Sequence, residues 1–360
     1  MDPNVSHIRD YDPVDGAWAN IQAITYDGAK IGSQKTKVFA YLGFPQGASA
    51  HKKVPAVVLV HGGSGHAFAQ WIKLWNDRGY AAIAMDTTGY FPSALGRGKA
   101  GSHGDAASWW HYGLYGPFLE NGYVNAPDND RMQQVPYQNV EEQWMFHGVV
   151  ATIMAHNVLL KDERVETSRI GICGISWGSV IASIAIGYDT RYAYAISVYG
   201  SGHLSHSLSF FREMFAHEKV RKLWSAEDRF HMVKIPTLWL AWVDDSNFSI
   251  NANTRSYGAL TDPYTVLSLK QAWHHSHPAG WAPEEIYRFA DSICYGKDNM
   301  VTCLSAPAGR EISFAIGKPD LETVTAKAFY LTQKLSYSQK EGQNKPTPDH
   351  TAWKDRKSVV

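Results

Sequence analysis

The chain has 360 residues, of which 44% are hydrophobic and 13% aromatic, a composition typical of globular proteins and too apolar for disorder. Lysine plus arginine and aspartate plus glutamate both number 34, so no charge excess predicts binding to nucleic acid or an anionic membrane. Neither a signal-peptide pattern in residues 1–30 nor an apolar run of about 18 residues occurs, so we expect a cytoplasmic protein.

Residues 1–18 are polar and predict a loosely attached N-terminal arm. Three alternating or apolar runs that follow predict strands: 21–26, 36–42 and 54–61. A helical pattern over 67–78 and another apolar run over 80–86 come next. Since strand, helix and strand alternate, the chain predicts an α/β protein with a mostly parallel sheet.

The segment from 87 to 139 has no clear periodicity and is rich in glycine, proline and aromatic residues, including Trp109 and Trp110. Segments of this length are usually functional or disordered, and the aromatic content argues against disorder. We expect either a cap beside an active site, with Trp109 and Trp110 binding substrate, or a surface crossover loop. A long helix is predicted over 140–160.

The stretch 165–186 predicts a buried strand, a tight turn and a helix, with the G-x-S-x-G sequence from Gly174 to Gly178 at the turn. This order is what a nucleophile elbow requires. Ser176 would be held at strained backbone angles, and glycines at 174 and 178 would prevent collisions with neighbouring backbone. The alternative is an ordinary glycine-rich turn between a strand and a helix.

A glycine-rich turn, His61-Gly-Gly-Ser-Gly65, directly follows the strand predicted over 54–61. Backbone N–H groups in such a turn can bind an oxyanion. A phosphate-binding turn is the alternative, but the G-x-G-x-x-G and Walker spacings are absent.

After Ser176, an apolar run over 236–243 predicts a strand that is followed by Asp244 and Asp245. Another predicted strand, over 264–273, is followed by a cluster of histidines. Serine needs a base to take its proton and an acid to orient that base, and doubly wound hydrolases have them in this order. We prefer Asp245 over Asp244 as the acid because it stands further past its strand.

For the base we prefer His277, which lies close to the following helix, and keep His275 as the alternative. A metal site formed by His274, His275 and His277 lacks the HExxH or carboxylate pattern that would support it, so no metal is expected.

Four stretches, RIGICGISWGS, VLVHGGSGHAF, AAIAMDTTGY and HSHPAGWAPEEI, together resemble bacterial α/β-hydrolases of the acetyl xylan esterase and dienelactone hydrolase-like group, relatives of prolyl oligopeptidases. The resemblance covers about residues 35–295. It implies an α/β-hydrolase fold, ester hydrolysis without a cofactor, and Ser176 as nucleophile. It also implies an oxyanion hole from the N–H groups of Trp177 and of the Gly62 and Gly63 region, with Gly63 preferred.

The sequence departs from this pattern at two positions, and its last part lies outside it. Trp242 stands where the acid motif has glycine, which leaves Asp244 open, and Ser179 replaces a frequent second glycine. Runs at 311–316 and 324–332 predict strands. We expect an arm over 1–18, a catalytic domain over 19–300, and a β-rich extension with a polar tail over 304–360.

The sequence therefore predicts a serine esterase that acts through an acyl-enzyme on a small-molecule ester, with a short acyl group such as acetyl on a sugar or aromatic alcohol. A prolyl-oligopeptidase-type peptidase is one alternative, although no propeller-like repeats precede the domain. A non-catalytic binding protein with the same fold is another. Whether the chain forms a homo-oligomer is left open.

Overall fold

A computed structural model describes residues 2–13, 16–63, 65–92, 115–118, 135–262, 264–270, 275–297, 301–303, 314–316, 328–331, 337–338, 347–348 and 353–356. Trp109, Trp110 and His274 lie outside the described residues. The chain divides into two compact units, Met1–Pro283 and Glu284–Val360. The domain boundaries expected from the sequence stay predictions.

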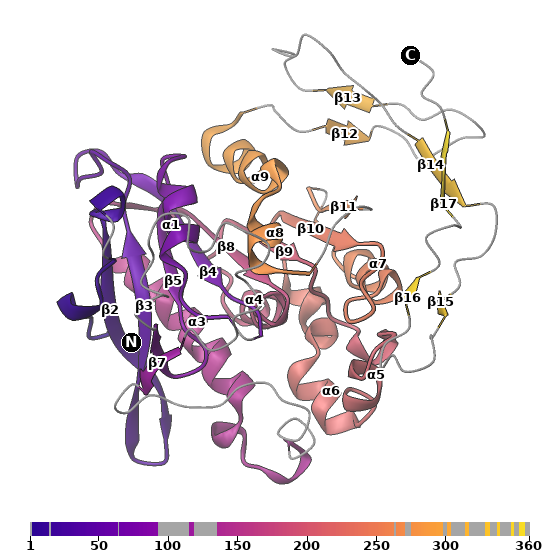
Figure 1. The fold of residues 1–360 in the computed structure, drawn as a ribbon, viewed down its shortest axis with the longest axis horizontal. Coiled ribbons are helices and arrows are strands. Elements are labelled where there is room, and N and C mark those ends of the chain that lie inside the picture. The colour runs from indigo at the N-terminus through magenta and orange to yellow at the C-terminus, as the bar shows by residue number, and fades with distance from the viewer. Residues whose placement is uncertain are drawn as a thin grey trace. The chain divides into compact units, whose positions relative to one another are not determined.

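The first unit is built on a nine-stranded sheet with the order β1-β2-β3-β5-β4-β8-β9-β10-β11 (Figure 1). The six strands from β5 to β11 pair in parallel, and β1, β2 and β3 form an antiparallel end. Their bounds are Ser6–His7 (β1), Ile21–Ile31 (β2), Gln34–Gly43 (β3), Val54–Val60 (β4), Ala81–Met85 (β5), Val165–Ile175 (β8), Tyr194–Val198 (β9), Thr237–Trp242 (β10) and Val266–Lys270 (β11). The predicted mostly parallel sheet is confirmed.

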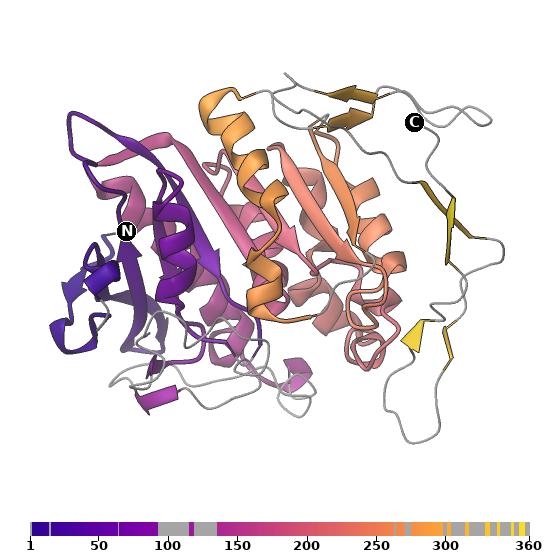
Figure 2. The same cartoon turned by 45° about the horizontal axis from the view of Figure 1, so that its top comes forward.

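Helices cover both faces of this sheet (Figure 2). The helices α3 and α4 pack against each other on one face, whereas α1 packs on β5 and β3 from the other face. The α-helices are α1 (Ala69–Asn76), α3 (Trp144–Lys161), α4 (Trp177–Tyr188), α5 (Phe211–Met214), α6 (Glu218–Trp224), α7 (Ile250–Gly258) and α8 (His277–Trp281). Short 3-10 helices are η1 (Arg9–Tyr11), η2 (Gly16–Trp18), η4 (Val135–Tyr137), η5 (Val140–Glu142), η6 (Leu204–His206) and η7 (Ala226–Met232).

The core lies between the sheet and its helices, and the central strand β4 shows why the fold forms. All seven residues of β4 are buried, as expected for a parallel strand covered on both faces. Val58 and Val60 belong to the apolar cluster that α3 and α4 cover, whereas the alternate residues Val57 and Leu59 are buried on the opposite face.

The N-terminal segment is part of the sheet, which corrects the expectation of a loose arm. Ser6 and His7 pair with Thr25 and Ile24 of β2. The carboxylate of Asp12 accepts the backbone N–H of Ala23 at 2.7 Å. These hydrogen bonds satisfy backbone groups at an otherwise open sheet edge.

Two further regions contain short strands. Within the segment expected as a cap, β6 (Tyr90–Pro92) pairs with β7 (Tyr115–Phe118). In the second unit, the described residues form α9 (Glu284–Tyr295) and three strand pairs. These pairs are β12 (Val301–Cys303) with β13 (Phe314–Ile316), β14 (Ala328–Leu331) with β17 (Trp353–Arg356), and β15 (Tyr337–Ser338) with β16 (Thr347–Pro348). Both strands predicted after residue 304 are therefore found, in shorter form.

Among the described residues, no helix combines the length and the apolar character needed to cross a membrane. The expected cytoplasmic location stays a prediction.

Candidate active site

The strained serine predicted at the G-x-S-x-G turn is confirmed. Ser176 lies between β8 and α4 at φ 57° and ψ −123°, in a region that residues other than glycine rarely adopt. Its N–H donates to the carbonyl of Val198 on the neighbouring strand at 3.0 Å, which holds the turn at the sheet edge. Its side chain therefore stands where the carboxyl end of the parallel sheet meets the start of a helix.

The flanking glycines are needed because the backbone passes too close for any side chain. A Cβ on Gly174 would lie 2.4 Å from the carbonyl oxygen of Gly178. A Cβ on Gly178 would lie 2.0 Å from the carbonyl oxygen of Val60, at the end of β4. The predicted collisions are thus present, and both involve backbone atoms that cannot turn away.

Asp245 and His275 form an ion pair or hydrogen-bonded pair beyond the ends of β10 and β11. The Nδ1 atom of His275 lies 2.7 Å from the Oδ2 atom of Asp245. The other carboxylate oxygen of Asp245 accepts the N–H groups of Asn247 and Phe248 at 2.8 and 3.0 Å. Since the Asp245 side chain is 2% exposed and that of His275 is 26% exposed, the acid is fixed inside and the imidazole faces outward.

Tyr199 and Phe248, which the sequence analysis did not identify, both pack against the imidazole of His275. The Tyr199 ring centroid lies 4.2 Å and the Phe248 centroid 5.8 Å from that of His275. The hydroxyl of Tyr199 donates to the carbonyl of Ser276, which fixes the adjacent backbone. No local sequence signal distinguishes these two aromatic residues from ordinary core residues.

The structure places His277 differently from the expectation that it pairs with Asp245. Its Nε2 atom accepts the backbone N–H of Gly62 at 2.9 Å. Its ring packs on Phe68, with 4.8 Å between centroids. Because His277 opens helix α8, its side chain turns toward the loop after β4, whereas His275 turns toward Asp245. The order of preference between the two histidines is therefore corrected in favour of His275.

The loop after β4 lies directly beside Ser176. A Cβ on Gly62 would lie 2.8 Å from the Cβ of Ser176 and 3.3 Å from Nε2 of His277. Ser176 and the histidine segment are therefore close in space. Across the described part of the chain, Ser176 Oγ makes no hydrogen bond to His275 or His277; such bonds are often long before substrate binds.

The expected oxyanion donors are the backbone N–H groups of Trp177 and Gly63, on two segments next to Ser176. Trp177 is the first residue of α4, so its N–H has no acceptor within the helix and lies at the positive end of the helix dipole. Gly63 follows Gly62 in the loop beside Ser176. The Trp177 ring points inward, 4.9 Å from Phe211 and 5.8 Å from Trp144 between centroids, so it fills the core.

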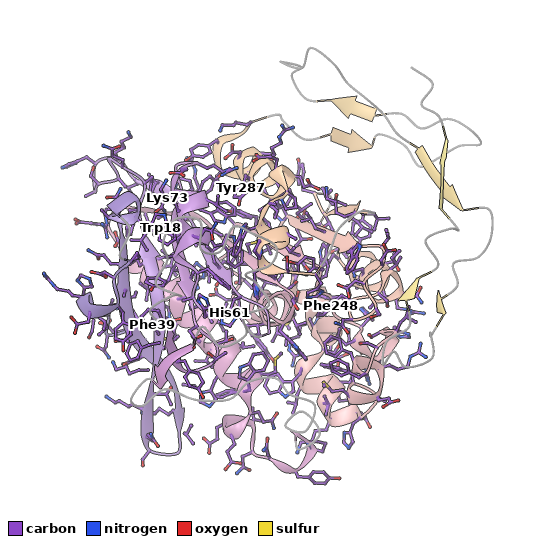
Figure 3. All side chains as sticks on the ribbon, viewed as in Figure 1. Trp18, Phe39, His61, Lys73, Phe248 and Tyr287 are labelled. Carbon is purple, nitrogen blue, oxygen red and sulfur yellow. The ribbon has the colours of Figure 1, made fainter. Side chains whose placement is uncertain are left out.

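His61, at the end of β4, anchors the same loop from its other side. Its Nε2 accepts the N–H of Thr87 at 3.0 Å, and its Nδ1 lies 2.7 Å from the carbonyl oxygen of Gly62. His61 is 2% exposed. Figure 3 labels His61 and Phe248, which come from the segments after β4 and β10 and border the site.

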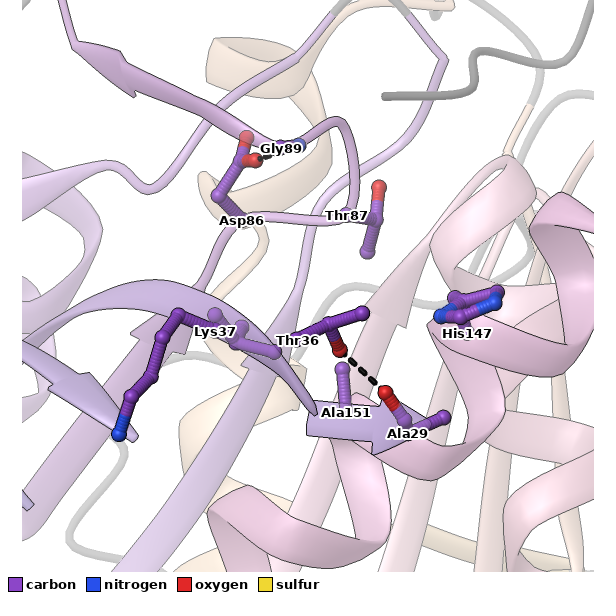
Figure 4. A pocket seen from close by; sticks show the side chains of 9 residues that line it. Ala29, Thr36, Lys37, Asp86, Thr87, Gly89, His147 and Ala151 are labelled. Atoms are coloured by element: carbon purple, nitrogen blue, oxygen red, sulfur yellow. Dashed lines mark hydrogen bonds between the residues drawn. The ribbon is translucent and has the colours of Figure 1, made fainter. Parts of the chain in front are cut away.

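A hollow lined in part by Thr87 lies between the β2–β3 hairpin, the turn after β5 and helix α3 (Figure 4). The carboxylate of Asp86 accepts the N–H of Gly89 at 2.6 Å and that of Thr88 at 2.8 Å. His147 Nε2 bonds the carbonyl of Glu141 at 2.7 Å. The bonds of Asp86 support the turn that carries Thr87.

Of three comparisons with known proteins, only the one with solved structures found similar proteins. No family model matches the sequence, and no curated protein matches it significantly. Among solved structures, an acetyl xylan esterase from Paenibacillus sp. R4 is similar, with a TM-score of 0.58 at 20% identity over 81% of this chain and 89% of that one.

Two further solved structures are also similar to this chain. Acetyl xylan esterase 1 from Thermoanaerobacterium sp. JW/SL YS485 has a TM-score of 0.58 at 14% identity, covering 81% of this chain and 88% of that one. An acylaminoacyl peptidase from Pyrococcus horikoshii has a TM-score of 0.51 at 16% identity, covering 76% of this chain and 42% of that one. The protein therefore has the α/β-hydrolase fold, as the sequence predicted.

Proposed function

We propose that the protein is a serine hydrolase that cleaves carboxylic esters through an acyl-enzyme. One observation carries the proposal: the strained Ser176 at the end of β8, with the bonded pair of Asp245 and His275 at the ends of β10 and β11 in the same sheet. Parallel strands bring their carboxyl ends to one edge, which supports a triad of these three side chains in the order typical of this fold.

The proposed reaction begins when Ser176 Oγ attacks the ester carbonyl carbon while Nε2 of His275 takes the hydroxyl proton. Asp245 keeps the His275 proton on Nδ1, so Nε2 presents its lone pair to the serine. The N–H groups of Trp177 and Gly63 stabilise the oxyanion, and each such donor lowers the barrier by about 3–4 kcal/mol.

His275 then gives its proton to the leaving alcohol oxygen, and the acyl group remains on Ser176. Water attacks this acyl-enzyme, His275 takes a proton from the water, and the carboxylic acid leaves as Ser176 recovers its proton. The scheme uses only side chains and backbone groups of this chain.

For the substrate we propose a short acyl group, such as acetyl, on a sugar or aromatic alcohol. The fold likeness to two acetyl xylan esterases supports an ester. The likeness to an acylaminoacyl peptidase supports cleavage of peptide bonds as the second candidate activity. The residues expected to bind substrate, Trp109 and Trp110, remain part of this proposal.

Labelling with a fluorophosphonate tests the proposal directly. We expect the parent protein to be labelled and to hydrolyse p-nitrophenyl acetate faster than long-chain esters, with both activities abolished in Ser176→Ala. Faster cleavage of peptidyl amides than of esters would favour the peptidase. A folded parent protein that is neither labelled nor active would instead be a binding protein.

A further inference from the structure

The two peptide groups that flank the Cα of Gly62 are each bonded by a histidine side chain. His61 contacts the Gly62 carbonyl oxygen through Nδ1 at 2.7 Å. His277 contacts the Gly62 N–H through Nε2 at 2.9 Å. The residue between these contacts lies beside Ser176, where a Cβ on Gly62 would approach the serine Cβ to 2.8 Å.

The partners of these histidines determine where their ring protons lie. Thr87 donates its N–H to Nε2 of His61, so that atom carries no proton and Nδ1–H donates to the Gly62 carbonyl. Gly62 donates its N–H to Nε2 of His277, so this nitrogen also carries no proton. A continuous series of donors and acceptors therefore runs from Thr87 through His61 and Gly62 to His277.

Neither histidine can act as the base in this arrangement. The Nε2 lone pair of His277 is already used by Gly62 N–H, and that of His61 by Thr87 N–H. His61 bonds the carbonyl of the peptide that joins Gly62 to Gly63, whereas His277 bonds the N–H of the preceding peptide, which joins His61 to Gly62. The Gly63 N–H lies in the same plane as the carbonyl that His61 bonds, and the contact from His277 fixes the backbone on the other side of the Gly62 Cα.

We propose that His61 and His277 are positioning residues, which together fix the two peptide groups flanking Gly62 so that the Gly63 N–H points at the oxyanion. These two contacts are called the clamp. This inference rests on the proposed esterase function. Preorganised donors act in the transition state and little in the ground state, so loss of the clamp lowers kcat and leaves KM nearly unchanged.

The electrostatic surroundings keep His277 in the form that the clamp requires. Burial lowers the pKa of His277 well below its ordinary value, and three facing histidines lower it further: His61 after β4, His66 before α1, and His275 in the preceding turn. Protonation of His277 would remove the acceptor for Gly62 N–H. The clamp is therefore intact at neutral pH.

Two substitutions separate the acceptor from the ring. His277→Phe keeps an aromatic ring against Phe68 and removes the acceptor, whereas His277→Gln places an amide oxygen near the position of Nε2. We expect kcat for p-nitrophenyl acetate to fall roughly 10- to 100-fold in His277→Phe with KM nearly unchanged. We expect His277→Gln to recover most of this loss, and affinity for a trifluoromethyl ketone inhibitor to follow kcat.

The matched control is His156→Phe, a buried histidine in α3 that bonds Asp189 and lies outside the site. It should lower the melting temperature without a selective loss of kcat. If the parent enzyme is active and His277→Phe retains its kcat, the clamp is wrong and the esterase stands. If the parent is neither active nor labelled, the esterase itself is wrong.

A measurement on the parent protein does not depend on variants that fold. Side-chain ¹⁵N–¹H NMR at neutral pH should show His277 neutral with the proton on Nδ1, and Nε2 of His61 as the nitrogen that accepts the Thr87 N–H. A proton on Nε2 of His277, or a charged imidazolium there, would overturn the inference.

Discussion

At the residue scale, hydrogen-bond partners separate two histidines that the sequence leaves equivalent. His275 and His277 both follow the last strand of the sheet, yet one bonds a carboxylate and the other a backbone N–H. An imidazole that donates Nδ1–H to Asp245 has its Nε2 lone pair directed outward for proton transfer. An imidazole that accepts Gly62 N–H has that lone pair in use.

A matched pair of variants at the two adjacent aspartates tests this arrangement. Asp245→Asn should lower kcat for an acetyl ester about 10⁴-fold, because an amide can donate to Nδ1 and so stabilise the wrong tautomer of His275. Asp244→Asn should stay close to the parent, since Asp245 is the one that bonds His275. Steady-state kinetics check both, and equal losses in the two variants would contradict the assignment.

At the element scale, the close crossing of α4 over the end of β4 holds the candidate nucleophile beside the glycine loop. The crossing is possible because Gly178 has no side chain where it meets the carbonyl oxygens of Val60 and His61. Packing of this kind involves backbone on both sides, so a small side chain cannot be accommodated by a rotamer change.

Replacing each of two glycines with alanine tests whether this close backbone approach limits which residue is tolerated there. Gly178→Ala should destabilise the protein by about 1–3 kcal/mol, because its Cβ would lie 2.0 Å from the Val60 carbonyl oxygen. Gly258→Ala, at the end of α7, should stabilise it by about 0.4–1 kcal/mol, because nothing lies within 4 Å of the added Cβ. Urea unfolding measures both changes, and the interpretation is wrong if Gly178→Ala is neutral.

At the scale of the whole molecule, several buried or half-buried histidines make stability depend on pH. Burial lowers the pKa of His147, His156, His203 and His277 below the ordinary value of 6.5. Each is therefore neutral in the folded protein under conditions where the unfolded chain binds a proton. Stability from these groups is complete above pH 6.5 and is lost as pH falls from there through the lowered values.

We expect the melting temperature to decrease when the pH is lowered from 7 to 5. Each histidine that takes up a proton only on unfolding decreases the unfolding free energy by up to about 1.4 kcal/mol per pH unit. Calorimetry at half-unit steps measures the number of protons taken up. A melting temperature that is constant or rises over this range would contradict the prediction.

Much of the architecture follows from local sequence, since continuous apolar runs such as 54–60 and the order of strand, turn and helix around Ser176 are local patterns. The serine, the acid and the histidine also each follow an apolar run that predicts a strand, in that order along the chain. Even the need for Gly174 and Gly178 follows from the tight turn itself. By itself, the sequence thus determined the sheet, the elbow and the set of candidate side chains.

Only the tertiary structure decided which members of that set meet. His275 bonds Asp245 while His277 turns to Gly62, the Trp177 ring fills the core, and the N-terminal residues pair with β2. Each of these outcomes depends on contacts between segments far apart in the chain. Hydrogen-bond direction and side-chain burial are properties of that three-dimensional neighbourhood, and residue spacing along the chain does not encode them.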